Sequence, residues 1–454
     1  SKPLVTGKSI TPTGEQTSVG SFPVNMILTP DRRFAMITGS GAREYITVIN
    51  TANGKIVSQI GFNAARKDLP KQKQDLYYGL VLGPVAADGS HPVYASRGSE
   101  NMVSLLTLAA DGTLTDTKRT IDYPDFDTDE LRKTPLYPAG IAVSADGSRL
   151  FAANNTVLAK QNLTSTVSVF DTATGQLVGT VAVDGYPFAV AALTTGSNAG
   201  KKVYVTSEQT GKLFVIDPAT LQVTRKVGVG SHPIALQFNR AQSQLYIANA
   251  DSDTVSVVDT KTDRVIRTIL LRPTSARALP GATPTGLALS SDEKRLYVTL
   301  ADMNAVAVVD MVSASVVGYI PVGWYPTAVG ISPDGKRLLV SNAKGVAERN
   351  PNSKPKPGIK ERPQYIQNII EGTVSSLPVP DTATLARLTE QTLANNYVSR
   401  IKNPVPFTNP GIKHVIYIIK ENRTYDQVLG DLPQGNGDKS LVLFGRDVTP
   451  NLHA

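Results

Sequence analysis

The stretch YPTAVGISPD at residues 325–334, followed by LLVSN at residues 338–342, decides the fold of this chain. A residue that is usually aromatic precedes a proline, alternating apolar positions follow, a polar turn closes the run, and a second apolar run begins. Related stretches recur about every 40 to 60 residues, a spacing typical of repeat proteins. The residues at the proline position are Pro23, Tyr77, Pro138, Pro187, Pro233, Pro284 and Pro326.

Each repeat supplies four runs with the composition of β-strands. Second runs read VYVTS from Val203 or LYVTL from Leu296, third runs read VSVVD from Val255, and a fourth reads LVGTVAV from Leu177. Their alternation of β-branched residues with Ser or Thr is typical of half-buried strands. Four antiparallel strands in each of seven units predict an all-β, seven-bladed β-propeller. Residues 4–19 and the last unit's own fourth run both remain candidates to complete the last blade.

Aspartates recur at two corners of the repeat. Recurrent carboxylates suggest metal ligands, but a short carboxylate before a turn also accepts backbone N–H groups and closes that turn. We favour the turn role because the aspartates at each corner come from different units. The residues are Asp171, Asp217, Asp259 and Asp310 after third strands, and Asp31, Asp146, Asp292 and Asp334 after first strands.

Composition limits the possible classes of protein. The 454 residues are 41% hydrophobic and include 36 Gly and 30 Pro, which suits a large core interrupted by many turns. The absence of cysteine excludes disulfides, thiolate metal sites and cysteine nucleophiles. We expect no membrane span, because no apolar run reaches about 18 residues. A cysteine-free chain that begins at Ser1 fits an exported bacterial protein, periplasmic or secreted, although a cytosolic protein could also lack cysteine.

The repeat resembles a known family. The LYVT and VYVT runs, the VSVVD third strands and the proline-anchored first strands resemble the YVTN-type β-propeller repeat of bacterial exported and surface-layer-like proteins. The resemblance covers roughly residues 19–379. It implies the fold and leaves the activity open, because propellers host many functions.

The residues just before the anchors are equivalent by repeat position, so we expect them at one end of the central channel. An aromatic channel mouth could stack a ligand ring. Alternatively, the same rings pack between adjacent blades. The propeller itself requires no cofactor in either case. These candidate ligand-binding residues are Phe22, Tyr137, Tyr186, His232 and Tyr325, with Trp324, the single tryptophan, beside them.

Changes in composition suggest three domains. Residues 1–380 form the propeller, with a Pro- and Lys-rich insertion at 343–371 in the last blade. This insertion either docks an anionic substrate or neighbouring domain, or is simply solvated. The net charge of +8 is otherwise spread along the chain, which argues against nucleic acid as a partner. Residues 381–411 form an amphipathic helix and a Pro-rich linker, and a new domain begins at 412–454.

The last domain carries the most specific chemical signal. Residues 414–419 are a continuous apolar run, as expected of a strand buried on both faces of an α/β sheet. ENRTYDQVLGDL from Glu421, GNGD, LFG and TPNLHA follow. These motifs resemble the start of the phosphoesterase family in the alkaline-phosphatase-like superfamily. The resemblance implies a divalent metal with Glu421 and Asn422 as ligands; alternatively, these two residues cap the following helix.

In that family, the nucleophile and the remaining metal ligands lie further along the sequence, so we expect the chain by itself to be inactive. The resemblance implies the propeller portion of a metal-dependent phosphoric ester hydrolase, with a phosphate ester as substrate and the rest of the phosphoesterase domain as partner. A second hypothesis is a non-catalytic propeller that recognises a cell-surface ligand or a partner. A third, a propeller with its own active site, fits least well because the first strands start mostly with apolar residues.

Overall fold

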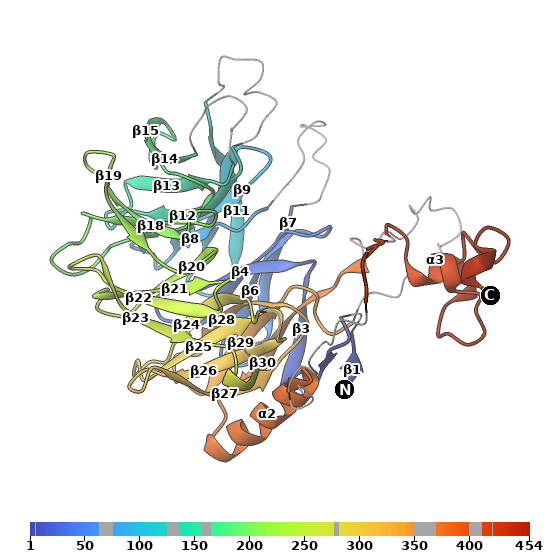
Figure 1. Cartoon of the computed structure of the whole chain (residues 1–454). Coiled ribbons are helices and arrows are strands. Elements are labelled where there is room, and N and C mark those ends of the chain that lie inside the picture. The colour runs from blue at the N-terminus through green and yellow to red at the C-terminus, as the bar shows by residue number, and fades with distance from the viewer. Residues whose placement is uncertain are drawn as a thin grey trace. The chain divides into compact units, whose positions relative to one another are not determined.

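The computed structural model describes residues 1–4, 6–62, 76–124, 136–156, 165–276, 281–347, 369–398, 411–419 and 421–454. These residues form seven four-stranded sheets and a small hairpin of β1 (Lys2–Pro3) and β2 (Ser9–Ile10). The sheets are arranged around a common centre as the blades of a propeller (Figure 1). The predicted seven-bladed fold of four-stranded antiparallel blades is confirmed.

The first three blades follow the predicted order, with consecutive strands paired antiparallel. Blade 1 contains β4 (Pro23–Leu28), β5 (Phe34–Gly39), β6 (Tyr45–Asn50) and β7 (Ile56–Gly61); blade 2 contains β8 (Leu80–Leu82), β9 (His91–Arg97), β10 (Met102–Leu108) and β11 (Leu114–Asp122); blade 3 contains β12 (Pro138–Val143), β13 (Arg149–Asn154), β14 (Thr166–Asp171) and β15 (Leu177–Ala182).

The next three blades have the same order. Blade 4 contains β16 (Pro187–Ala192), β17 (Val203–Ser207), β18 (Lys212–Asp217) and β19 (Gln222–Gly228); blade 5 contains β20 (Pro233–Phe238), β21 (Gln244–Asn249), β22 (Thr254–Asp259) and β23 (Arg264–Leu270); blade 6 contains β24 (Pro284–Leu289), β25 (Arg295–Leu300), β26 (Ala305–Asp310) and β27 (Ser315–Pro321).

Blade 7 closes the ring with strands from both ends of the propeller. It contains β28 (Pro326–Ile331), β29 (Arg337–Asn342) and β30 (Gly372–Pro378), and its fourth strand is β3 (Glu15–Gly20). The two outer strands pair antiparallel, with Thr17 opposite Val374. The segment that precedes the first anchor therefore completes the last blade. Most of the predicted insertion, residues 348–368, lies outside the described residues.

The core lies between neighbouring blades. In one cluster, Tyr297 and Val308 of blade 6 pack against Val340 and Leu377 of blade 7, and none of the four is more than 4% exposed. The middle strands of each blade have both faces covered, so they are apolar or small at nearly every position. Burying each large apolar side chain contributes about 1.5–3 kcal/mol, which makes the interfaces between blades the main stabilising term.

The recurrent aspartates close turns. Each accepts a hydrogen bond from a backbone N–H two or three residues later, at 2.7–3.3 Å. In the turns after first strands, a Ser or Thr hydroxyl also donates to the carboxylate, as Ser332 does to Asp334 at 2.6 Å. The predicted structural role of these residues is confirmed.

Helix α2 (Thr382–Asn395) packs on the outermost strand of blade 6. Asp381 caps it by accepting the N–H of Thr384 at 2.7 Å, and the predicted helix is confirmed. The hydroxyl of Thr389 accepts the N–H of Tyr319 on β27 at 2.9 Å. The helix approaches closely because β27 carries Gly318, whose missing Cβ would lie 2.6 Å from Leu385 Cγ. A sheet edge is thus covered.

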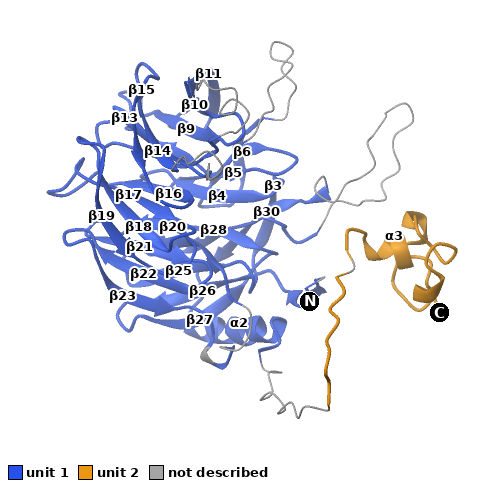
Figure 2. Ribbon diagram, turned by 45° about the horizontal axis from the view of Figure 1, so that its top comes forward, with its two compact units in different colours: residues 1–401 blue, residues 402–454 orange. Residues whose placement is uncertain are grey.

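The chain divides into two compact units, residues 1–401 and 402–454 (Figure 2). The second unit contains the short helix α3 (Tyr425–Leu429) and two single turns, η5 (Lys439–Leu441) and η6 (Pro450–Leu452). A third such turn, η3 (Thr274–Ala276), precedes blade 6. Within the described ranges, no helix is long and apolar enough to cross a membrane.

Candidate functional site

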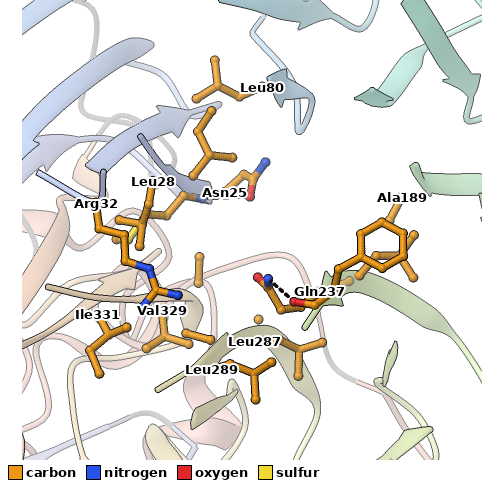
Figure 3. A pocket seen from close by; sticks show the side chains of 18 of the residues that line it. Asn25, Leu28, Arg32, Leu80, Ala189, Gln237, Leu287, Leu289, Val329 and Ile331 are labelled. Carbon is orange, nitrogen blue, oxygen red and sulfur yellow. Dashed lines mark hydrogen bonds between the residues drawn. The ribbon is translucent and has the colours of Figure 1, made fainter. Parts of the chain in front are cut away.

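The inner strands of the blades enclose a cavity of about 910 Å³ along the central channel (Figure 3). Its wall is mixed: apolar side chains such as Leu28, Leu287 and Val329 alternate with polar ones such as Asn25. Among the polar groups, Gln237 donates to the carbonyl oxygen of Phe238 at 2.8 Å. A cavity of this size, with both apolar and polar lining groups, is large enough for a small molecule.

Tyr78 crosses the channel near the start of the inner strands. Its hydroxyl, from blade 2, donates to the carbonyl oxygen of Ile234 in blade 5 at 3.4 Å. Its ring centroid lies 4.5 Å from that of Phe188, and its own carbonyl accepts Asn25 Nδ2 at 2.9 Å. Burial, and then the negative charge of Glu208, raise the pKa of Tyr78 far above its usual value, so the phenol stays protonated. Tyr78 therefore bridges blades 2 and 5 and forms part of the cavity wall.

The predicted mouth residues share one backbone arrangement. The carbonyl of each accepts the N–H of the residue that follows the second strand of its blade, as in Ala343 to Tyr325 at 2.9 Å. Most of them also adopt a left-handed backbone, with φ of 50° at Phe22, 56° at Tyr137, 54° at His232 and 60° at Tyr325. Non-glycine residues in this region are strained, so neighbouring contacts must hold them there.

A side chain of the preceding blade provides one such contact. Asn304, just before the third strand of blade 6, accepts the N–H of Tyr325 at 3.0 Å. Asn101 and Asp253 hold the equivalent residues Tyr137 and Thr283 at 3.3 and 3.0 Å. We did not predict these inter-blade bonds. The sequence feature that could have predicted them is an Asn or Asp directly before the third strand of the repeat.

The aromatic candidates lie in pairs from adjacent blades. The rings of Phe22 and Tyr325 are 6.4 Å apart between centroids, and Tyr137 meets Tyr77 edge-on at 5.9 Å. Such rings stabilise the contact between blades beyond the area that they bury. Of these, Phe22, Tyr137 and Tyr325 are half-buried.

Trp324 and Tyr325 share a cation. The ammonium group of Lys344 lies 4.9 Å from the ring centroid of each. Lys344 follows β29, and its N–H donates to the carbonyl of Trp324 at 3.1 Å, so backbone pairing holds the two residues together. The arrangement joins a positive charge to two half-buried aromatic surfaces at the mouth.

The opposite side of the mouth is acidic. His232 Nε2 lies 3.7 Å from Glu208 Oε1, and His232 Nδ1 lies 4.0 Å from Asp251 Oδ2. The Glu208 side chain is only 16% exposed, and burial raises its pKa despite the nearby His232 and a hydrogen bond from Asn155. Tyr186, 37% exposed, accepts the Glu208 N–H through its carbonyl at 2.9 Å. Sequence reasoning found Tyr186 and His232 but missed Glu208.

Within the described ranges, no group of three His, Asp or Glu side chains lies close enough to hold a metal ion. The predicted ligands Glu421 and Asn422 are both exposed, and Asn422 has a left-handed backbone with φ of 77°. Neither residue is the N-cap of α3, since Thr424 occupies that position. The carboxylate and amide oxygens fit a hard divalent cation chemically, but two residues are an incomplete ligand set.

The predicted buried strand at residues 414–419 is wrong for this chain. The segment is extended but belongs to no described sheet, and the side chains of residues 415–419 are 70–85% exposed. The physical reason is that a strand gains its hydrogen bonds and its burial from neighbouring strands, which the described residues do not supply.

The last motif, TPNLHA, is locally ordered. His453 Nε2 lies 2.7 Å from Asp431 Oδ1, and the His453 side chain is 1% exposed. The hydrogen bond to Asp431, and then one with the backbone of Thr449, raise the pKa of His453. This ion pair and the N–H of Asp438 bonded to Asp426 at 2.7 Å fold the segment onto itself.

Comparisons with known proteins relate the chain to propellers. No protein-family model matches it. It is 29% identical over 102 residues to the uncharacterised protein YncE of Salmonella typhimurium, covering 22% of this chain and 26% of that protein. It is 28% identical over 178 residues to the seven-bladed β-propeller protein Rv1057 of Mycobacterium tuberculosis, covering 38% and 42%. The chain thus matches less than half the length of either relative.

A solved structure shows the same fold at low identity. Kuenenia stuttgartiensis hydrazine synthase superposes with a TM-score of 0.54 and 16% identity, covering 72% of this chain and 94% of that one. The chain is a seven-bladed β-propeller with uncharacterised propeller relatives. At this identity the likeness concerns the fold alone.

Proposed function

We propose that this chain is the propeller portion of an exported, metal-dependent phosphoesterase, whose catalytic domain begins near residue 412. The observation that carries the proposal is the run at residues 415–419, five apolar or aromatic side chains that are 70–85% exposed. Soluble proteins rarely leave such a run uncovered, and the phosphoesterase-like motifs from Glu421 follow it directly. A sheet of the alkaline-phosphatase-like type would cover it.

In this proposal, Glu421 and Asn422 supply oxygen ligands to one divalent cation just after the exposed run at residues 415–419. The bound metal would neutralise charge on the phosphoryl group and activate the nucleophile. This chain's own contribution is to supply the two oxygen ligands directly after that run. The absence of cysteine fits an oxidising, exported location.

The test uses the natural protein. We expect an intact mass well above 48.3 kDa and hydrolysis of p-nitrophenyl phosphate or its bis ester that a chelator abolishes. Glu421→Gln should lower kcat by about 100-fold or more, because it removes a charged ligand. Glu390→Gln, on the exposed face of α2, is the matched control. A natural mass equal to that of this chain, without hydrolysis, would exclude the proposal.

A second candidate function is a non-catalytic binding propeller. The observation that favours it is the mouth itself, with Lys344 over Trp324 and Tyr325 on one side and Glu208 with His232 on the other. Opposite charges beside aromatic rings suit a polar ligand that carries both signs, such as a peptide or cell-wall fragment.

Trp324 is the only tryptophan, so its fluorescence reports occupancy of the mouth directly. We expect cell-wall fragments or short peptides to change the emission of this chain, and Lys344→Met to weaken that response. Lys226→Met, whose ammonium pairs with the exposed Asp184, is the control. No response to any such ligand would count against this candidate.

A further inference from the structure

The channel end opposite the mouth carries charged side chains that neither proposed function uses. Arg32 of blade 1 donates through Nη1 to the hydroxyl of Ser291 in blade 6 at 3.1 Å. Arg240 of blade 5 donates through Nη2 to the carbonyl of the same Ser291 at 2.8 Å, and its N–H is bonded to Glu293. All four residues line the cavity. Side chains from three blades therefore converge at this end.

The backbone at Arg32 and Glu293 is strained, because both residues have a left-handed conformation. In six of the seven blades, the first-to-second-strand turn has one left-handed position; the longer turn of blade 4 has two, both glycine. The single position is glycine in blades 2, 3 and 7, as at Gly147 and Gly335. Arg32, Gln242 and Glu293 occupy it in blades 1, 5 and 6, with φ of 58°, 50° and 58°. A non-glycine residue there costs about 1–2 kcal/mol. Three long polar side chains at strained positions around one cavity suggest a function.

The charges at this end do not balance. Burial lowers the pKa of Arg32, and the positive charge of the nearby Arg240 lowers it further. The negative charge of Glu293 acts in the opposite direction. Asp31 also lines the cavity, but it already pairs with Arg33 at 2.5 Å. Two guanidinium groups thus face one available carboxylate. An anion between them would complete the charge and accept paired N–H groups.

Apolar side chains of the cavity wall lie beside the arginines. Figure 3 shows Arg32 extending into the cavity near Val329 and Ile331, with Leu28 on the same side. We propose that this end of the channel binds a small organic anion. Its phosphate or carboxylate group lies between Arg32 and Arg240, and its apolar body fills the adjoining cavity. The volume of about 910 Å³ is ample for such a molecule. This proposal is independent of the phosphoesterase assignment.

The test is calorimetry on the full chain at low ionic strength, with a chelator present to exclude metal-mediated binding. The probes are phenyl phosphate, benzoate, inorganic phosphate and neutral benzyl alcohol. We expect phenyl phosphate or benzoate to bind, and the tighter one identifies the preferred head group. Inorganic phosphate should bind more weakly because it has no apolar body, and benzyl alcohol should not bind measurably.

Variants that remove either the positive charges or the negative charge test the proposed anion site. R32Q/R240Q should weaken anion binding by about tenfold or more, because charge-assisted hydrogen bonds are lost. Glu293→Gln should strengthen it several-fold, since the competing carboxylate is removed. Arg149→Gln, whose partner Asp171 lies outside the cavity lining, is the control. If these charged residues had only a structural role, Glu293→Gln would not strengthen anion binding.

Two results would overturn the proposal: no binding of either aromatic anion, or equal affinity in the wild type, R32Q/R240Q and E293Q. Thermal denaturation of each variant shows whether it folds. If R32Q/R240Q does not fold, E293Q decides: unchanged or weaker binding by E293Q rejects the site.

Discussion

The guanidinium of Arg43 donates a hydrogen bond to the carboxylate of Glu371, 328 residues further along the chain. The same carboxylate accepts the hydroxyl of Ser18 on β3, while Arg43 also donates to the carbonyl of Ile370 at 3.3 Å. Glu371 directly precedes β30, so this contact joins blade 1 to both outer strands of blade 7. It reinforces the closure of the ring.

Glu371→Gln should therefore weaken closure. The two side chains are only 27% and 19% exposed, so removing the charge leaves Arg43 poorly paired. We expect a loss of about 2 kcal/mol in the free energy of unfolding by urea. Lys226→Gln removes an ion pair that is about half exposed and should cost well under 1 kcal/mol. Equal effects of the two substitutions would show that the closure contact is unimportant.

Gly318→Ala should displace helix α2. The added Cβ would meet Leu385 Cγ at 2.6 Å and Thr389 Oγ1 at 2.7 Å, and both belong to the helix. We expect faster amide hydrogen exchange in α2 and about 1–3 kcal/mol of destabilisation. The control is Gly228→Ala on the outer strand of blade 4, where no atom lies within 4 Å of the new Cβ. Unchanged exchange in α2 would contradict the predicted packing.

Acid should weaken the first-strand turns. The Ser144 hydroxyl, and then the N–H and hydroxyl of Ser148, lower the pKa of Asp146 from 3.8 to about 2. Because its pKa is lower in the folded state, ionised Asp146 stabilises the fold at pH values above its unfolded-state pKa. This stabilisation is lost as the pH falls through the folded-state pKa. Asp146→Asn should thus be less stable than the wild type above about pH 4, and the gap should vanish near pH 2. Urea unfolding across that range measures it; a constant gap would refute it.

Glu208 should have the opposite pH dependence. Burial raises its pKa, with Asp251 adding to and His232 opposing the shift, so the folded state binds the proton more tightly than the unfolded chain. Stability then falls as pH rises through the folded pKa. Glu208→Gln should be more stable than the wild type at pH 8 and similar at about pH 4. Glu390→Gln should match the wild type at both; a less stable E208Q at pH 8 would disprove the prediction.

The exposed run at residues 415–419 should bind apolar dyes. Ile416 is 85% and Ile418 79% exposed, so replacing both with Asn should lower the fluorescence of bound anilinonaphthalene sulfonate without changing the melting temperature of the propeller. Val312→Asn is the control, because that residue is 83% exposed but stands alone on a turn. Unchanged dye binding in the double variant would mean that the run is covered in solution.

Local sequence patterns predicted the regular parts well. Alternating β-branched residues and proline anchors gave the number of blades, the strand order and the turn role of residues such as Asp334, because each depends on residues close together in the chain. The amphipathic helix after residue 381 is local in the same way. Contacts that join distant repeats, such as Asn304 with Tyr325, needed the structure.

The sequence by itself determined a seven-bladed propeller followed by a different segment, since periodicity and turn chemistry act within each repeat. Only the tertiary structure decided that β3 completes blade 7, that Tyr78 crosses the channel and that Arg32 and Arg240 converge on Ser291. The physical reason is ring closure. It brings together residues that are hundreds of positions apart, and no local pattern encodes which of them will meet.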